Sequence, residues 1–95
     1  MKPELTLYSR EDCHLCDEMK AVIRRVARAM PLSLNEVDID RAPEFQFKFG
    51  EEVPVLFIDG RKAFKYRVTE RELRRKLTES SSFGSTLKGI ILKRR

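Results

Sequence analysis

The chain has 95 residues, of which 41% are apolar and 37% charged, and its formal net charge is +5. This length allows one small domain with a single hydrophobic core. The apolar content is too high for an intrinsically disordered chain, and charged residues interrupt every stretch that could form a membrane span or the apolar part of a signal peptide. We therefore expect a cytoplasmic protein without a transmembrane helix.

The first half of the chain predicts a strand, a helix and a second strand. Residues 4–8 alternate apolar and polar side chains, as a half-buried strand does. From Cys16 onward the apolar residues recur at steps of three and four, which indicates an amphipathic helix. Residues 32–40 predict the second strand, with a bulge or a late start because Leu34 and Val37 fall out of phase. Two strands separated by one helix suggest a βαβ unit with parallel pairing.

The second half predicts a short helix, a hairpin and a final helix. Residues 41–50 suit a short irregular helix, and residues 55–58 are a continuous apolar run typical of a buried central strand. The pair Asp59-Gly60 favours a two-residue turn into an antiparallel strand over residues 61–66. The final helix is expected to begin with a capping box, Thr69-Glu70-Arg71-Glu72. The order β-α-β-α-β-β-α predicts an α/β fold, a mixed four-stranded sheet with helices on both faces.

A serine run divides the chain into an expected domain, residues 1–79, and a basic tail, residues 80–95. The serines at 80–82 indicate a flexible break, after which an extra short helix could form. Residues 1–60 carry 8 basic and 12 acidic side chains, whereas residues 61–95 carry 12 and 3. This excess favours a solvated basic face, and the alternative is a docking surface for an acidic partner protein, nucleic acid or anionic lipid. We do not expect nucleic-acid binding, because the phenylalanines at 45, 47 and 49 lie in the net-acidic part.

Cys13 and Cys16 are the only two cysteines in the chain. Their spacing does not suit a secreted disulfide scaffold, and in a reducing compartment it suggests redox chemistry or metal binding. Cys13 is expected at the cap or first position of the helix, where free N–H groups and the helix dipole favour a thiolate. Cys16 is expected nearly one turn further on the same face, within reach of a mixed disulfide at Cys13. These positions predict Cys13 as the attacking thiol and Cys16 as the resolving thiol.

His14 and Leu15 separate the cysteines. A protonated His14 would stabilise the thiolates and make the pair more oxidising, whereas Leu15 contributes no charge. Glu11 and Asp12 act in the opposite direction, because anions next to Cys13 disfavour its thiolate. Whether the Cys13 thiolate is favoured or disfavoured depends on which of these charged side chains point toward its sulfur.

Metal binding is the main alternative use of the cysteines. A closed zinc site needs four protein ligands, and this segment offers two thiols and one imidazole. We therefore expect no metal site within one chain, although a metal or an iron–sulfur cluster that bridges two chains stays open. A further alternative is a non-catalytic binding module in which the cysteines are incidental.

Pro54 marks the start of the strand at 55–58, because proline cannot donate to a sheet ladder. An ordinary trans proline would explain this position. A cis Val53–Pro54 bond would instead turn the preceding backbone toward a neighbouring site and leave its N–H and C=O groups unpaired there.

Three segments together resemble the glutaredoxin-like branch of the thioredoxin superfamily. They are Leu5-Thr6-Leu7-Tyr8-Ser9-Arg10 ahead of Cys13-His14-Leu15-Cys16, then Val37-Asp38-Ile39-Asp40, and finally Val53-Pro54-Val55-Leu56-Phe57-Ile58-Asp59-Gly60. The resemblance covers residues 4–79. It implies a thioredoxin-like fold, Cys13 as nucleophile, Cys16 as resolving thiol and a cis Pro54 beside them. It also implies that the Val53 backbone pairs with the substrate as an added strand would.

The chain departs from this family at the places where glutathione binds. Glutathione-using members typically carry a Lys shortly before the cysteines, a Thr before Val-Pro and a Gly-Gly after the hairpin. Here those places hold Arg10, Glu52 and Lys65-Tyr66-Arg67-Val68. Arg10 could replace the charge of the lysine, but Glu52 adds an anion, and bulky side chains stand where close backbone approach is expected. Exchange with a protein disulfide is therefore better supported, with glutathione as a second, weaker option for a co-substrate.

The resemblance and the residues together predict a monomeric thiol–disulfide oxidoreductase that needs no bound cofactor. The expected partners are a disulfide-containing protein and a reductant, either glutathione or a thioredoxin reductase-type protein. Cys13 and Cys16 are the expected catalytic residues. The expected substrate-binding residues are Arg10, His14, Leu15, Val53 and Pro54.

Overall fold

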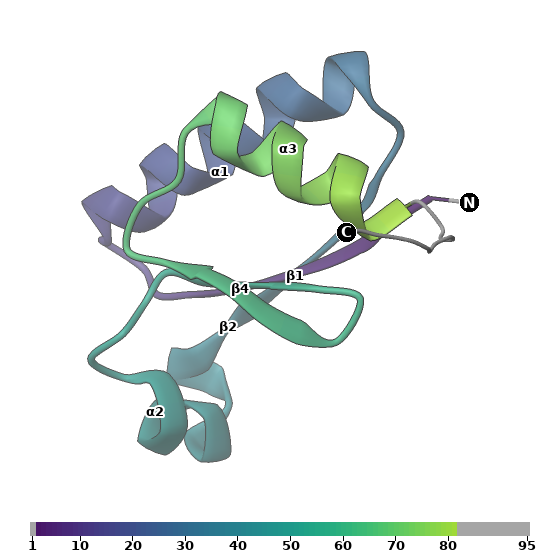
Figure 1. Ribbon diagram of the computed structural model, residues 1–95. Helices are drawn as coiled ribbons and strands as arrows, with labels where there is room; N and C mark the ends of the chain where they lie inside the picture. Colours follow the sequence, from purple (N-terminus) through teal and green to yellow (C-terminus); the bar gives the residue numbers. More distant parts are fainter. Residues whose placement is uncertain (1, 82–95) are drawn as a thin grey trace.

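The computed structural model describes residues 2–81, which form four strands and their connecting helices (Figure 1). In chain order the elements are β1 (Glu4–Ser9), α1 (His14–Ala29), β2 (Ser33–Asp38), the 3₁₀ helix η1 (Ile39–Arg41), α2 (Pro43–Phe49), β3 (Val55–Ile58), β4 (Arg61–Lys65) and α3 (Glu70–Ser81). Most of the predicted basic tail, residues 82–95, lies outside the described residues.

The four strands form one mixed sheet in the order β2-β1-β3-β4. β1 pairs with β2 in parallel and with β3 antiparallel, and β4 returns antiparallel to β3. Figure 1 shows α1 and α3 together on one face of the sheet and α2 on the opposite face. The predicted element order and the α/β fold with a mixed four-stranded sheet are confirmed.

The second strand differs from the prediction. β2 ends at Asp38 and pairs with β1 without a register shift, and Ile39 begins η1. Of the two expected alternatives, the bulge is absent, and the strand starts one residue late, at Ser33. The irregularity of the sheet lies between Leu56 and Phe57 in the β3–β4 hairpin. Leu34 and Val37 are three positions apart in a regular strand, so their side chains lie on opposite faces of the sheet. Leu34 packs on the α1–α3 side of the sheet.

The main core lies between the sheet and the pair α1 and α3. Its members alternate along the strands and recur at helical spacing along the helices, as amphipathic elements require. The buried residues of this cluster are Leu5, Leu7, Met19, Val22, Ile23, Val26, Leu56, Ile58, Val68, Leu73 and Leu77. This core holds the start of α1, which carries the cysteines, against the ends of β1 and β3.

Local signals in the sequence form the expected turn and cap. Asp59 and Gly60 both have positive φ, 51° and 85°, as a hairpin turn of this kind requires. At the start of α3, the N–H of Thr69 donates to Glu72 Oε1 at 2.9 Å, and the N–H of Glu72 donates to Thr69 Oγ1 at 3.1 Å. The predicted capping box is therefore confirmed.

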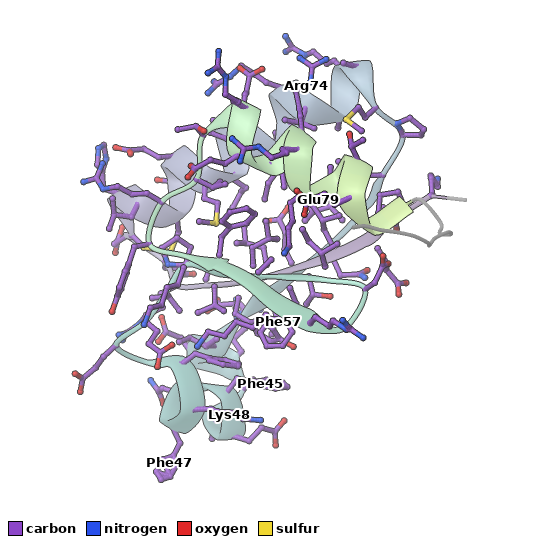
Figure 2. All side chains as sticks on the ribbon, viewed as in Figure 1. Phe45, Phe47, Lys48, Phe57, Arg74 and Glu79 are labelled. Carbon is purple, nitrogen blue, oxygen red and sulfur yellow. A yellow bond between two sulfur atoms is a disulfide. The ribbon has the colours of Figure 1, made fainter. Side chains whose placement is uncertain are left out.

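A second, aromatic cluster lies on the other face of the sheet, under α2. The ring of Tyr8 lies 4.9 Å from the rings of Phe45 and Phe49 and 5.4 Å from that of Phe57. Phe47, from the same helix, is 87% exposed, and Figure 2 shows it pointing away from the sheet. Two of the three phenylalanines of α2 thus attach this helix to the sheet.

α3 continues through Ser80 and Ser81, which we expected to begin a flexible break. That prediction is wrong for these two residues. Serine is tolerated in a helix, and the capping box together with buried Leu73 and Leu77 stabilises this one. Among the described helices, none has the length and apolar character needed to cross a membrane.

Candidate redox site

Cys13 is the N-cap residue of α1. Its backbone is extended, with φ −112° and ψ 105°, and its carbonyl accepts the first bond of the helix from the N–H of Asp17 at 3.1 Å. Its sulfur accepts a second bond, 3.2 Å from the N–H of Cys16. A sulfur thus takes the place of the usual serine or aspartate oxygen at the cap, as the sequence predicted for this position.

The two cysteines are joined by a disulfide in this structure, with their Cα atoms 5.2 Å apart. Cys16 is only 1% exposed, whereas Cys13 is partly exposed. The sulfurs therefore lie within bonding reach of each other, and solvent reaches Cys13 more readily than Cys16. This asymmetry agrees with the roles predicted for the two thiols.

Val53 and Pro54 lie at the same end of the sheet as the cysteines. Tyr8, near the end of β1, pairs with Val55, the first residue of β3, so the loop to Cys13 and the segment before Val55 leave the sheet side by side. The Val53–Pro54 bond is cis, the geometry that the resemblance implied. Within residues 2–81 neither the N–H nor the C=O of Val53 has a hydrogen-bond partner. Both groups are thus available to an added chain.

His14 is 86% exposed, and its Nε2 lies 2.7 Å from Glu18 Oε2. Glu18 also faces Arg67, whose Nη1 lies 3.8 Å from Oε1. One carboxylate therefore contacts both basic side chains, one of which directly follows Cys13. Sequence reasoning did not identify Glu18, although its position four residues after His14 on a helix signals such a pair.

Arg10, expected to bind substrate, is engaged within the fold. Its Nε lies 3.1 Å from Asp40 Oδ1, and its Nη1 donates to the carbonyl of Gly50 at 3.4 Å. These contacts join the loop before Cys13 to η1 and to the end of α2. Its role in substrate binding stays a prediction, as does that of Leu15, which is partly exposed between the cysteines.

Glu52, directly before Val53, bonds to Lys62 of β4, with Nζ and Oε1 2.6 Å apart. The hydrogen bond and the charge of Lys62 hold the pKa of Glu52 below its ordinary value, with a smaller contribution from the charge of Lys65. The anion that the sequence placed beside the site therefore already has a cationic partner. This ion pair attaches the Val53–Pro54 segment to the hairpin.

Tyr66 is a site residue whose geometry the sequence did not indicate. Its φ is 70°, in the left-handed region that glycine adopts most readily. Its N–H donates to the Pro54 carbonyl at 2.8 Å, and its hydroxyl donates to the Glu51 carbonyl at 3.3 Å. Tyr66 therefore lies beside Pro54 and bonds to the segment that precedes it.

The sequence matches the family described as Glutaredoxin-like domain over residues 4–78. The chain belongs to this family. A glutaredoxin-like protein of Dictyostelium discoideum is 33% identical over 75 residues, which cover 73% of this chain and 69% of that protein. The site described above thus belongs to a glutaredoxin-like domain.

Solved structures agree with the family and the fold. A structural genomics target protein from X. campestris has a TM-score of 0.66 and 36% identity, over 78% of this chain and 95% of that one. Desulfothioredoxin from Desulfovibrio vulgaris Hildenborough has a TM-score of 0.61 and 29% identity, over 84% and 82% of the two chains. The chain is therefore a glutaredoxin-like domain with a thioredoxin-like fold and a pair of cysteines in the C-x-x-C arrangement.

A metal or an iron–sulfur cluster that bridges two chains stays a prediction, because the structure describes a single chain. In residues 2–81 no group of three or more His, Cys, Asp or Glu side chains gathers as metal ligands. The two sulfurs bond to each other instead.

Proposed function

We propose that this protein is a thiol–disulfide oxidoreductase that reduces disulfides in other proteins. The observation that carries the proposal is the disulfide between a partly exposed N-cap cysteine, Cys13, and a buried Cys16 in the next turn. The membership of the glutaredoxin-like family and the likeness to thioredoxin-fold proteins support the same chemistry.

The reaction starts from the reduced dithiol. The Cys13 thiolate attacks one sulfur of the substrate disulfide, the substrate S–S bond breaks, and the departing thiolate takes up a proton. The Cys16 thiol then loses its proton and attacks the Cys13 sulfur, which releases the second substrate sulfur as a thiol. Two electrons pass from the enzyme to the substrate, and the enzyme is left in the disulfide form that the structure shows.

The start of α1 favours the first step. The N–H of Cys16 points at the Cys13 sulfur, and the positive end of the helix dipole lies there too. Both interactions stabilise a thiolate more than a neutral thiol, so they raise the fraction of reactive sulfur at neutral pH.

The Val53 backbone is proposed to hold the substrate. Its unpaired N–H and C=O can form the two hydrogen bonds of an added strand, next to the disulfide-bearing end of the sheet. A polypeptide supplies matching groups on both sides of its half-cystine. We accordingly favour a protein disulfide as substrate, with an external thiol or a reductase restoring the dithiol, in a reducing compartment such as the cytosol.

Reduction of bis(2-hydroxyethyl) disulfide by the purified protein, with dithiothreitol as the electron donor, tests the proposal. Cys13→Ser should abolish the catalysed rate, because no nucleophile remains at the exposed position. Cys16→Ser, reduced and then freed of dithiothreitol before the disulfide is added, should instead accumulate a mixed disulfide at Cys13, visible as an added mass. Full activity of Cys13→Ser, or a mixed disulfide that forms at Cys16, would refute the assigned roles.

A further inference from the structure

Tyr66 combines an unusual backbone conformation with an exposed side chain. L side chains rarely adopt a φ of 70°, and such strained residues cluster at functional sites. Two hydrogen bonds, from its N–H to Pro54 and from its hydroxyl to Glu51, keep the residue in place. Its side chain nevertheless stays 41% exposed, and only Phe47 is a more exposed large apolar residue in the described part of the chain.

Tyr66 is one of the residues that line a groove between α1 and the segment that joins β4 to α3. The floor of this groove is apolar: Met19, Val22 and Val68 line it and are 1%, 9% and 7% exposed. The rim carries charges that are already balanced. Arg25 bonds to Glu70 at 2.9 Å, and Arg67 faces Glu18 at 3.8 Å.

Two contacts connect the lining of the groove with the redox site. On one wall, Glu18 pairs with His14, the residue after Cys13. On the other, Tyr66 bonds to Pro54, the residue after the unpaired Val53 backbone. A chain that pairs with Val53 and offers a sulfur to Cys13 therefore passes the mouth of this groove.

We propose that Tyr66 and this groove bind an apolar or aromatic side chain of the polypeptide that carries the substrate disulfide. This inference rests on the proposed function and deepens it. An apolar floor and an aromatic wall match an apolar side chain. A carboxylate ligand fits less well, because both rim arginines already face carboxylates of the protein. Tyr66 is thus a residue that favours polypeptide substrates over small disulfides.

Two substrates and three variants test this role. Insulin serves as the polypeptide disulfide and bis(2-hydroxyethyl) disulfide as the small one, with dithiothreitol as donor for both. Tyr66→Gly removes the ring while allowing the same backbone, since glycine adopts a φ of 70° freely. Tyr66→Phe keeps the ring and removes only the hydroxyl bond to Glu51. Phe47→Ala removes the other exposed aromatic residue of the described part of the chain, which lies in α2 away from the groove, as the control.

Tyr66→Gly is expected to lower kcat/KM for insulin about tenfold relative to the small disulfide. Tyr66→Phe and Phe47→Ala should leave this ratio within about twofold of the wild type. An unchanged ratio in Tyr66→Gly, or the same change in Phe47→Ala, would overturn the inference while leaving the redox function intact. A wild-type protein that reduces neither disulfide would instead refute the proposed function.

Discussion

The backbone N–H of Cys16 donates to the sulfur of Cys13 across 3.2 Å, so Cys13 caps the helix turn that holds Cys16. The same peptide group lies in the first turn of α1, where N–H groups lack helical partners. A sulfur placed there is stabilised as an anion once the disulfide is reduced. The geometry that closes the disulfide is thus also the geometry that prepares the thiolate.

The reduced protein should react with iodoacetamide at Cys13 before Cys16. Cys13 is partly exposed and adjoins the free N–H groups of the helix, whereas Cys16 is 1% exposed. We expect a rate difference of about tenfold or more at neutral pH. Peptide mass spectrometry after short labelling times measures it, and faster labelling of Cys16 would contradict the proposed order of attack.

The ion pair between Glu52 and Lys62 should stabilise the fold at neutral pH and should no longer do so in strong acid. Lys62 lowers the pKa of Glu52 in the folded state, so the stabilisation is complete above the unfolded pKa of about 4.3. It is lost as the pH falls through the lower pKa of the folded state. Urea midpoints of wild type and Glu52→Gln should therefore differ at pH 7 and converge near pH 2. A difference that persists there would exclude this pair as its source.

Truncation of two phenylalanines of α2 should change the free energy of unfolding by very different amounts. Phe49 is 6% exposed and its ring lies 4.9 Å from that of Tyr8, whereas Phe47 is 87% exposed. Phe49→Ala should lower the free energy of unfolding by about 3 kcal/mol, because it opens a cavity in the aromatic cluster. Phe47→Ala should change it by less than about 0.5 kcal/mol. Urea denaturation of both variants measures the difference, and equal losses would show that α2 packs differently.

The capping box should contribute measurably to α3. Thr69→Ala removes the oxygen that accepts the N–H of Glu72, which should cost about 1 kcal/mol and lower Tm by about 4–8 °C. Arg71→Ala, inside the box but exposed, is the control and should change Tm by about 2 °C at most. A loss no larger than that of the control would mean that the box is not formed in solution.

The order of elements could be predicted because each element carries a local signal. The helical spacing after Cys16, the Asp59-Gly60 turn and the Thr69–Glu72 box depend on neighbouring residues alone, and each occurs as expected. For β2 the sequence left a bulge or a late start open, and the strand has no bulge and starts one residue late, at Ser33. The spacing of Leu34 and Val37 could not show that these residues lie on opposite faces of a regular strand.

In the candidate site, too, positions set by neighbouring residues could be predicted, whereas contacts between distant residues could not. The positions of Cys13 and Cys16 follow from a strand, a loop and a helix start that are adjacent in sequence. The contact of Arg10 with Asp40 joins residues thirty positions apart, and that of Tyr66 with Glu51 spans fifteen. Such contacts depend on how the loops pack. The sequence therefore predicted that Arg10 binds substrate and did not show its contacts within the fold. Nor did it indicate the positive φ of Tyr66.

A redox titration of the Cys13–Cys16 pair tests the central claim most directly. The protein is equilibrated in dithiothreitol or glutathione buffers of graded potential, quenched in acid, alkylated and weighed by mass spectrometry. We predict a single two-electron transition between a dithiol and an intramolecular disulfide, with no disulfide-linked dimer. Two thiols that stay free in every oxidising buffer, or that pair only between chains, would contradict the account.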